Sequence, residues 1–195
     1  MKMKEELFIS VDVETSGPVP GLYSLLSIGA CLVEDDRRAF ECQLKPLSMH
    51  ADPKALEVTG FSLEQLARDG LEPALAMEKF AAWVNQVAPP TTTPVFVGLN
   101  AGFDWSFVNY YFHSYLGNNP FGFAPLDIKA LYMGVAGTPW SRAKSSEMVK
   151  TLGVEPTGDH NALHDARFQA ALFRSTLKLR DGSRQRLDDD KSASR

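Results

Sequence analysis

Three strand-like segments precede the first long helix of this sequence, and their order limits the folds open to the chain. Leu7 to Val13 is apolar and rich in β-branched residues, which is typical of a buried strand. Leu25 to Val33 and Ala39 to Leu44 are also strand-like, and the polar residues 35–38 between them predict an antiparallel hairpin. The sequence therefore begins with three strands, of which the last two are adjacent.

The remainder of the sequence alternates helices with short strands. Ser62 followed by Gln65 predicts the start of a short helix, and Glu72 to Val87 has apolar residues at the spacing of an amphipathic helix. Further elements are expected at 94–98 and 126–128 (strands) and at 104–116, 145–152 and 163–179 (helices). This order predicts an α/β fold in which helices flank both faces of a mixed sheet.

The composition indicates one globular domain. Apolar residues make up 44% and charged residues 23% of the 195 residues, as in ordinary globular proteins. We expect one domain over residues 1–180, and a disordered tail over 181–195, which lack aromatics and are rich in Asp, Ser, Lys and Arg. No apolar run approaches the ~20 residues of a membrane span, and no signal region is recognisable, so a cytoplasmic location and no membrane partner are expected.

The charge balance argues against a protein that coats nucleic acid. The formal net charge is −4 and the sequence pI about 5.6, whereas non-specific binders of a duplex usually carry a strongly basic surface. An enzyme that holds a few terminal nucleotides remains compatible with this charge, because metal ions can neutralise phosphates in place of Lys and Arg.

Four acidic residues and one histidine lie in three distant segments. Asp12 and Glu14 are two residues apart near the end of the first strand, so their side chains leave the same face. Asp104 lies between a strand and a helix, and His160 and Asp165 frame the start of the last helix. Gathered carboxylates repel one another unless cations lie between them. If the fold joins the three segments, they predict a phosphodiester-cleaving site with two divalent metals and a histidine base.

Each segment taken alone has a simpler interpretation. The acids at 12 and 14 can be a solvated strand end, and Asp104 can stabilise the N-terminus of its helix. His160 and His164 form an H-x-x-x-H pair, which on a helix can bind zinc, although a third ligand at the spacing of zinc hydrolases is missing. Only the combination of the three segments favours the two-metal interpretation.

Together the three segments resemble the motifs of the DEDDh family of 3′→5′ exonucleases. This family includes ribonuclease T, oligoribonuclease and the proofreading subunit of bacterial DNA polymerase III. The motifs are D-x-E-T at 12–15, N-x-x-F-D at 100–104 and H-x-A-L-x-D-A at 160–166, and the resemblance covers roughly residues 7–178. Asn161 stands where a tyrosine subclass would have its tyrosine, so the histidine subclass fits better. Leu99 and His164 depart from many relatives, which puts substrate preference in question more than chemistry.

The resemblance implies a ribonuclease H-like fold with a five-stranded mixed sheet, and a role for each of the five residues. Asp12 would bridge two Mg²⁺ or Mn²⁺ ions, Glu14 and Asp165 would complete one site, and Asp104 would hold the other ion. These are the hard oxygen ligands that such ions require. His160 would accept a proton from the attacking water and must be neutral to do so, so activity should rise with pH.

The resemblance also implies a substrate and a product. Single-stranded DNA or RNA 3′ ends would be trimmed to nucleoside 5′-monophosphates, with Phe61 and Phe103 stacking on terminal bases and Thr15 and Asn100 also contacting substrate. Core positions remain the alternative for both phenylalanines. The resemblance leaves the oligomeric state open, because ribonuclease T and oligoribonuclease form dimers whereas the proofreading subunit does not. The alternative function is a catalytically inactive module of the same fold that binds nucleic-acid 3′ ends or a protein.

Overall fold

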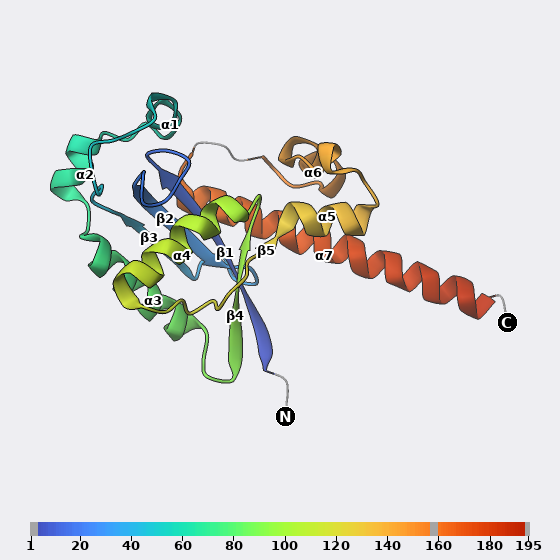
Figure 1. The fold of residues 1–195 in the computed structure, drawn as a ribbon. Helices are drawn as coiled ribbons and strands as arrows, with labels where there is room; N and C mark the ends of the chain where they lie inside the picture. The colour runs from blue at the N-terminus through green and yellow to red at the C-terminus, as the bar shows by residue number, and fades with distance from the viewer. Residues whose placement is uncertain (1–3, 157–159, 194–195) are drawn as a thin grey trace.

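A five-stranded mixed sheet forms the centre of the molecule in the computed structural model, which describes residues 4–156 and 160–193 (Figure 1). The strand order is β3-β2-β1-β4-β5. β1 pairs antiparallel with β2 and β2 antiparallel with β3, whereas β4 runs parallel to β1 and β5 parallel to β4. The strands are β1 (Glu5–Thr15), β2 (Leu25–Leu32), β3 (Ala39–Gln43), β4 (Thr92–Gly98) and β5 (Leu126–Asp127). The predicted fold class is confirmed.

Helices cover both faces of this sheet. On one face, Val11 of β1 belongs to the same buried cluster as Phe80 and Phe112, which come from two packed helices, α3 and α4. On the other face, Val97 of β4 shares a cluster with Phe173 from the long helix α7, and α5 and α6 lie against α7. The helices are α1 (Pro53–Thr59), α2 (Leu63–Asp69), α3 (Pro73–Val87), α4 (Gly102–Leu116), α5 (Ile128–Ala136), α6 (Ser145–Leu152) and α7 (Ala162–Ala193), with a 3₁₀ turn η1 (Trp140–Arg142).

Two helices, α1 and α5, were not predicted, although their end signals are present in the sequence. Asp52 accepts the backbone N–H of Lys54 at the start of α1, and Gly60 ends this helix in a left-handed conformation. Asp127 accepts the N–H of Ala130 at the start of α5, which Gly137 ends in the same way. Both helices are short, so their apolar periodicity is weak and the capping residues carry the signal.

The last helix is longer than the sequence pattern indicated. We expected disorder from residue 181 onward, but α7 continues to Ala193. Apart from Gly182 and four aspartates, this stretch consists largely of residues that tolerate a helix well, and no proline interrupts it. Figure 1 shows this part of α7 projecting beyond α5 and α6, away from the sheet.

A glycine on β2 allows α7 to lie directly on the sheet. Gly29 pairs with Asp12 of β1. A Cβ atom at Gly29 would lie 2.1 Å from the backbone carbon of Ala162 and 2.2 Å from the nitrogen of Leu163. No side chain fits at that distance, so glycine is required for this close approach. The N-terminal turn of α7 therefore lies beside the strand position that carries Asp12.

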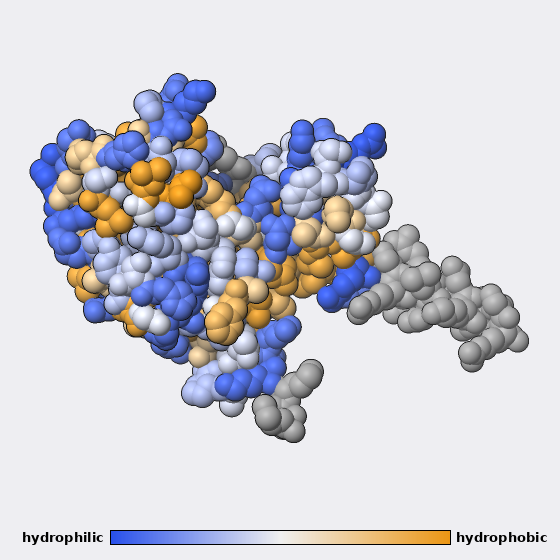
Figure 2. Space-filling model, viewed as in Figure 1, coloured by the Kyte–Doolittle hydropathy of each residue, from blue (hydrophilic) through white to orange (hydrophobic). Residues whose placement is uncertain are grey.

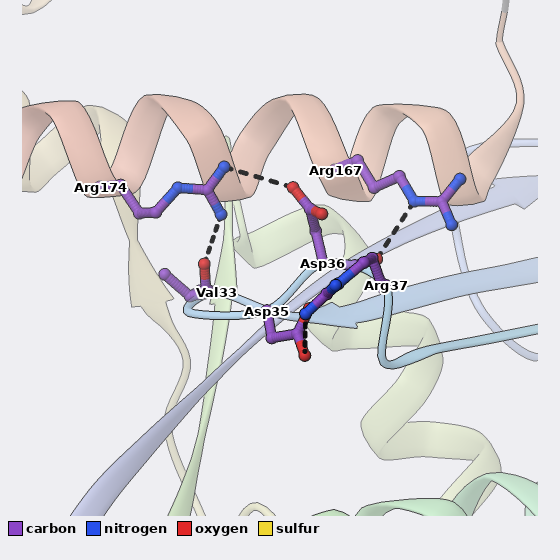
Figure 3. A network of polar contacts seen from close by, with 6 residues as sticks. All are labelled: Val33, Asp35, Asp36, Arg37, Arg167 and Arg174. Atoms are coloured by element: carbon purple, nitrogen blue, oxygen red, sulfur yellow. Dashed lines mark hydrogen bonds and ion pairs between the residues drawn. The ribbon is translucent and has the colours of Figure 1, made fainter.

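Arginines of α7 fasten this helix to the turn between β2 and β3 (Figure 3). Arg174 donates to the backbone oxygen of Val33 and pairs with the Asp36 carboxylate at 3.3 Å, and Arg167 Nε donates to the Asp36 backbone oxygen at 3.3 Å. Figure 3 shows both guanidinium groups on the same side of the helix. These bonds fix the position of α7 relative to the hairpin and hence to β1.

The two cysteines lie on opposite faces of the sheet. Cys31 belongs to the cluster beneath α7 and Cys42 to the cluster beneath α3 and α4. Cys31 pairs with Ala39 and Cys42 with Ile28, so the two thiols do not oppose each other across the hairpin. Both are buried and free, as expected for structural thiols.

The outer surface is of mixed character. In Figure 2, hydrophobic residues over the α5–α7 region and near the loop after β1 alternate with hydrophilic stretches. Large apolar side chains with substantial exposure include Val19, Leu22 and Phe123. Within residues 4–156 and 160–193, no helix combines the length and apolar character needed to cross a bilayer.

Candidate active site

The fold brings the three sequence segments to one open cleft at the edge where β1 and β4 end. All five predicted catalytic residues, Asp12, Glu14, Asp104, His160 and Asp165, line this cleft. Val13, Leu99, Asn100 and Phe103 complete its wall. Segments separated by some 150 residues in the sequence therefore meet at a single point on the surface.

Strand β1 carries two of the acids. Asp12 and Glu14 leave the face of β1 that α7 covers, whereas Val11 and Val13 point into the core beneath α3 and α4. The last paired residues of β1 and β4 are Ser10 and Val97, so the two strands separate before Asp12. This separation of the strands opens the cleft.

Asp104 faces β1 from the first turn of α4. Its side chain is buried, and its Oδ1 accepts the backbone N–H of Val13 at 3.1 Å. This N–H lies beyond the last β1–β4 pair, so the carboxylate takes the place of a strand partner. An acid in the first turn also interacts favourably with the helix N-terminus. Asp104 thus has both a structural contact and a place in the cleft.

The turn between β4 and α4 has a backbone conformation that suits few residues. Asn100 adopts a left-handed conformation with φ of 57°, which asparagine tolerates better than most side chains. Asp127 supports this turn, because its Oδ2 accepts the backbone N–H of Ala101 at 2.7 Å. Asp127 was not predicted as a site residue; an aspartate directly before the apolar residues of α5, a typical N-cap, was the available signal.

His160 also has a left-handed backbone, with φ of 51°, two residues before α7 begins at Ala162. The side chain of Asn161 then caps the helix, because its Oδ1 accepts the N–H of His164 at 3.0 Å. Its Nδ2 donates to Glu41 of β3 at 3.3 Å. Strained residues of this kind concentrate at functional sites. Asp165 follows within the first turn of α7 and faces the same cleft.

Burial and mutual repulsion disfavour ionisation of the carboxyl groups. Burial, followed by the charges of Asp104, Glu14 and Asp165, raises the pKa of Asp12 well above its ordinary value. Burial first, then Asp165 and Asp104, raises the pKa of Glu14 to about 8. The pKa of Asp104 is raised to about 7, again chiefly by burial. Such a cluster is unfavourable unless protons or cations neutralise it.

The donor set fits divalent metal ions of the hard, oxygen-preferring kind. Ligand atoms of Glu14, His160 and Asp165 all lie within 4.8 Å of one another, and Asp12 and Asp104 line the same cleft. Carboxylate oxygens are the ligands that Mg²⁺ and Mn²⁺ prefer. His164, by contrast, lines a separate cavity with Val154, Glu155, Arg167, Phe168 and Ala171. The histidine pair considered for zinc is therefore not brought together in this cleft.

A buried glutamine adjoins the acids and was missed by the sequence analysis. Gln169 Nε2 donates to Asp12 Oδ1 at 2.5 Å, and Gln169 Oε1 accepts the backbone N–H of Leu99 at 2.8 Å. Gln169 lies one helical turn after Asp165, between the buried residues Ala166 and Ala170. A polar residue at a core-facing helical position was the signal that could have found it.

A second cavity adjoins the first and shares Val13, Glu14 and Phe103 with it. It is lined by Val13, Glu14, Thr15, Lys54, Ala55, Val58, Thr59 and Phe103. Phe103 is 41% exposed, so its ring is accessible to a ligand. Thr15 is buried, and its hydroxyl donates to the Gly17 backbone oxygen at 2.9 Å. Phe61 lines neither cavity and instead packs, partly buried, beside Leu63 and Leu66.

The raised pKa values predict how stability without metal depends on pH. The folded protein keeps protons on Glu14 and Asp104 up to about pH 7–8, whereas the unfolded chain releases them near pH 4. Folding therefore binds protons in this window, and the free energy of unfolding must fall as pH rises through it. Each pKa unit corresponds to about 1.4 kcal/mol, so with EDTA present we expect a loss of at least about 2 kcal/mol, or roughly 4–8 °C in Tm, between about pH 5 and pH 8.

Glu14→Gln is the matched variant for this prediction. It removes one titrating group and one source of repulsion, so its Tm in EDTA should vary less over the same pH range. Added Mn²⁺ should raise the Tm of the unmodified protein more at high pH, since metal binding displaces protons. Parallel pH profiles for the two proteins in EDTA would contradict the assigned pKa shift.

Comparison with known proteins gives consistent matches. The family model RNase_T, described as exonuclease, matches residues 9–173. The 3′-5′ DNA exonuclease Cap18 of Escherichia coli is 57% identical over 179 residues, which are 92% of this chain and 96% of the relative. The family match spans all three motif segments.

Solved structures confirm the fold. The nuclease domain of 3′hExo, a DEDDh family member bound to rAMP, superposes with a TM-score of 0.68 at 15% identity, covering 91% of this chain and 94% of that domain. E. coli exonuclease I in complex with a dT13 oligonucleotide gives 0.69 at 18% identity, covering 95% of this chain but 43% of that protein. The chain thus corresponds to less than half of exonuclease I.

Proposed function

The chain belongs to the RNase_T exonuclease family and is a 3′–5′ exonuclease, and from this we propose that it trims single-stranded DNA by a metal-dependent reaction at the cleft of Asp12. One observation carries the proposal: four carboxylates and His160 from three distant segments line one open cleft. DNA is the proposed substrate because the relative at 57% identity is named a DNA exonuclease. The inactive-module alternative is disfavoured, because all five residues are present.

We propose that the carboxylates of Asp12, Glu14, Asp104 and Asp165 hold two divalent cations, Mg²⁺ or Mn²⁺, with Asp12 shared between them. When bound, such ions neutralise the phosphate, lower the pKa of water and stabilise the departing oxygen. Without them, the carboxylates would repel a phosphodiester. The raised pKa values of Asp12, Glu14 and Asp104 support this assignment, since burial and, for Asp12 and Glu14, the neighbouring carboxylates disfavour negative charge that bound cations would stabilise.

His160 is proposed as the general base. Its side chain is exposed at the rim of the cleft, and its ligand atom lies within 4.8 Å of Glu14 and Asp165 oxygens. It would accept a proton from the water that attacks the terminal phosphorus. The bond from phosphorus to the 3′ oxygen then breaks, leaving a shortened strand with a 3′ hydroxyl and a nucleoside 5′-monophosphate.

The second cavity is the proposed site of the terminal nucleotide. Ala55, Val58 and the exposed ring of Phe103 provide apolar surface for a base, where stacking contributes about 1–3 kcal/mol with little sequence preference. Thr15 and Lys54 add polar groups to the same wall, and Asn100 lines the neighbouring cleft. Phe61 is better described as a packing residue, since it lies against Leu63 and Leu66.

The direction of cleavage tests this proposal. A 5′-labelled single-stranded DNA incubated with Mn²⁺ should give a descending ladder, and nucleoside 5′-monophosphates should accumulate. A 3′-phosphate should slow cleavage sharply, because it adds negative charge next to the carboxylates that line the cleft. A duplex should be trimmed only to its paired region, since stacking on Phe103 needs an unpaired base.

A covalently closed single-stranded circle is the control for an internal cut. Cleavage of the circle would show an endonuclease and contradict the proposed function. RNA of the same sequence, assayed beside the DNA, tests the substrate preference inferred from the relative. A homodimer and a cytoplasmic location remain predictions from the sequence, for which sedimentation and cell fractionation are the direct measurements.

A further inference from the structure

We infer that Gln169 is a positioning residue for metal binding: its side-chain amide holds the Asp12 carboxylate in one orientation and ties it to the end of β4. The proposed role of Gln169 requires no contact with substrate or metal, because Gln169 acts through Asp12. The inference rests on the proposed function, because it assumes that Asp12 binds a divalent cation.

The two hydrogen bonds of Gln169 define which way its amide points. The backbone N–H of Leu99 is a fixed donor, so the atom that it meets at 2.8 Å must be the amide oxygen. The amide nitrogen then necessarily faces Asp12, where it donates to Oδ1 at 2.5 Å. A donor directed at a carboxylate makes a short, charge-assisted bond. The contact therefore suits ionised Asp12, the form that binds metal.

Gln169 fills the gap left where the strands part. β1 and β4 pair up to Ser10 and Val97, and continuing this register would set Asp12 beside Leu99. In place of a strand hydrogen bond, the Gln169 amide spans the two positions from α7. The side chain is 5% exposed and sits between Ala166 and Ala170, both fully buried, so it has little freedom to move.

In this geometry, Oδ1 of Asp12 accepts the hydrogen bond from Gln169. The other carboxylate oxygen and the remaining lone pairs can bind a cation in the cleft. The charges of Asp104, Glu14 and Asp165 repel the Asp12 carboxylate, and without a fixed donor the Asp12 side chain would be free to turn away from them. Hydrogen-bonding partners of metal ligands orient these ligands, and their loss typically weakens metal affinity by about 10–100-fold. Gln169 is expected to contribute an effect of this size.

Gln169→Met tests the inference, because methionine has a similar length and tolerates a helix, but it cannot donate to Asp12 and its thioether is only a weak acceptor for the Leu99 N–H. Titration of Mn²⁺, followed by the electron paramagnetic resonance signal of free Mn²⁺, should show affinity weakened about 10–100-fold. The Mn²⁺ concentration for half-maximal cleavage should rise by a similar factor, while the KM for the oligonucleotide changes little. Unchanged Mn²⁺ affinity in a folded Gln169→Met protein would overturn the inference.

Thr176→Val provides the matched control. Thr176 is another fully buried polar residue of α7, and its hydroxyl donates to the Leu172 backbone oxygen at 2.8 Å, away from the cleft. This variant should lose some thermal stability but keep the Mn²⁺ affinity of the unmodified protein. Equal weakening in both variants would show a general effect of loosening α7 and would also overturn the positioning role.

A measurement on the unmodified protein applies even if Gln169→Met fails to fold. In ¹⁵N-labelled protein, titration with Mg²⁺ should shift the side-chain NH₂ of Gln169 and the backbone N–H of Leu99. The side-chain amide of Asn119, which donates to Asn109 at 3.0 Å, should not shift. A Gln169 signal that is indifferent to Mg²⁺ would overturn the inference. Absence of both Mg²⁺ binding and cleavage would instead overturn the proposed function.

Discussion

Asp12→Asn is expected to abolish cleavage and, at the same time, to stabilise the metal-free protein. Asp12 is the proposed shared ligand, and even the loss of an outer hydrogen-bonding partner of a metal ligand costs roughly 10–100-fold, so we expect a loss of at least about 10³-fold in kcat. Without metal, burial and the charges of Asp104, Glu14 and Asp165 all disfavour this carboxylate. An amide of the same shape removes that repulsion, which should raise Tm in EDTA by about 2–5 °C.

The two effects must be measured on one protein preparation. Mn²⁺ should raise the Tm of the unmodified protein, because a ligand that binds only the folded state stabilises it, and this gain should largely disappear in Asp12→Asn. Asp69→Asn, which changes an exposed acid at the end of α2, serves as the control and should alter neither activity nor the response to metal. An active Asp12→Asn enzyme would refute the assignment of the shared ligand.

The strands and long helices could be predicted because burial sets their periodicity directly. β2 is buried along its whole length and reads as a continuous apolar run. α3 buries one stripe, and its apolar residues recur at helical spacing. The short helices α1 and α5 were missed because they depend on caps at Asp52 and Asp127 rather than on an apolar stripe. The helical end of α7 was missed because a polar sequence gives no periodic signal.

The acidic residues of the candidate site could be predicted from the sequence, but the residues that hold them in position could not. Asp12, Glu14, Asp104 and Asp165 stand in spaced motifs, so the sequence alone could group them. The supports act through single contacts with the backbone or with a carboxylate, as Gln169 does for Leu99 and Asp12 and Asp127 does for Ala101. Gly29 is a further example, since its role depends on how closely α7 approaches β2. Such contacts follow from the assembled fold and leave little trace in local sequence patterns.

His160→Asn is expected to reduce kcat by about 10²–10⁴-fold, the usual contribution of a general base. Asparagine cannot accept the proton from water at neutral pH, but it tolerates the left-handed backbone that His160 adopts, so the entry into α7 should be preserved. Single-turnover cleavage of the 5′-labelled oligonucleotide at saturating Mn²⁺ measures this loss.

Metal affinity separates the two roles that the position of His160 allows, because its ligand atom lies within 4.8 Å of oxygens of Glu14 and Asp165. If His160 is a base that binds no metal, His160→Asn should leave Mn²⁺ affinity nearly unchanged, since four carboxylates remain. If His160 is a metal ligand, the same substitution should weaken Mn²⁺ affinity as well as lower the rate. His164→Ala is the matched control, because His164 belongs to the same motif but lines the cavity beside Val154 and Phe168. If His164→Ala loses as much activity as His160→Asn, the cleft does not distinguish the two histidines and the assignment of His160 as the base fails.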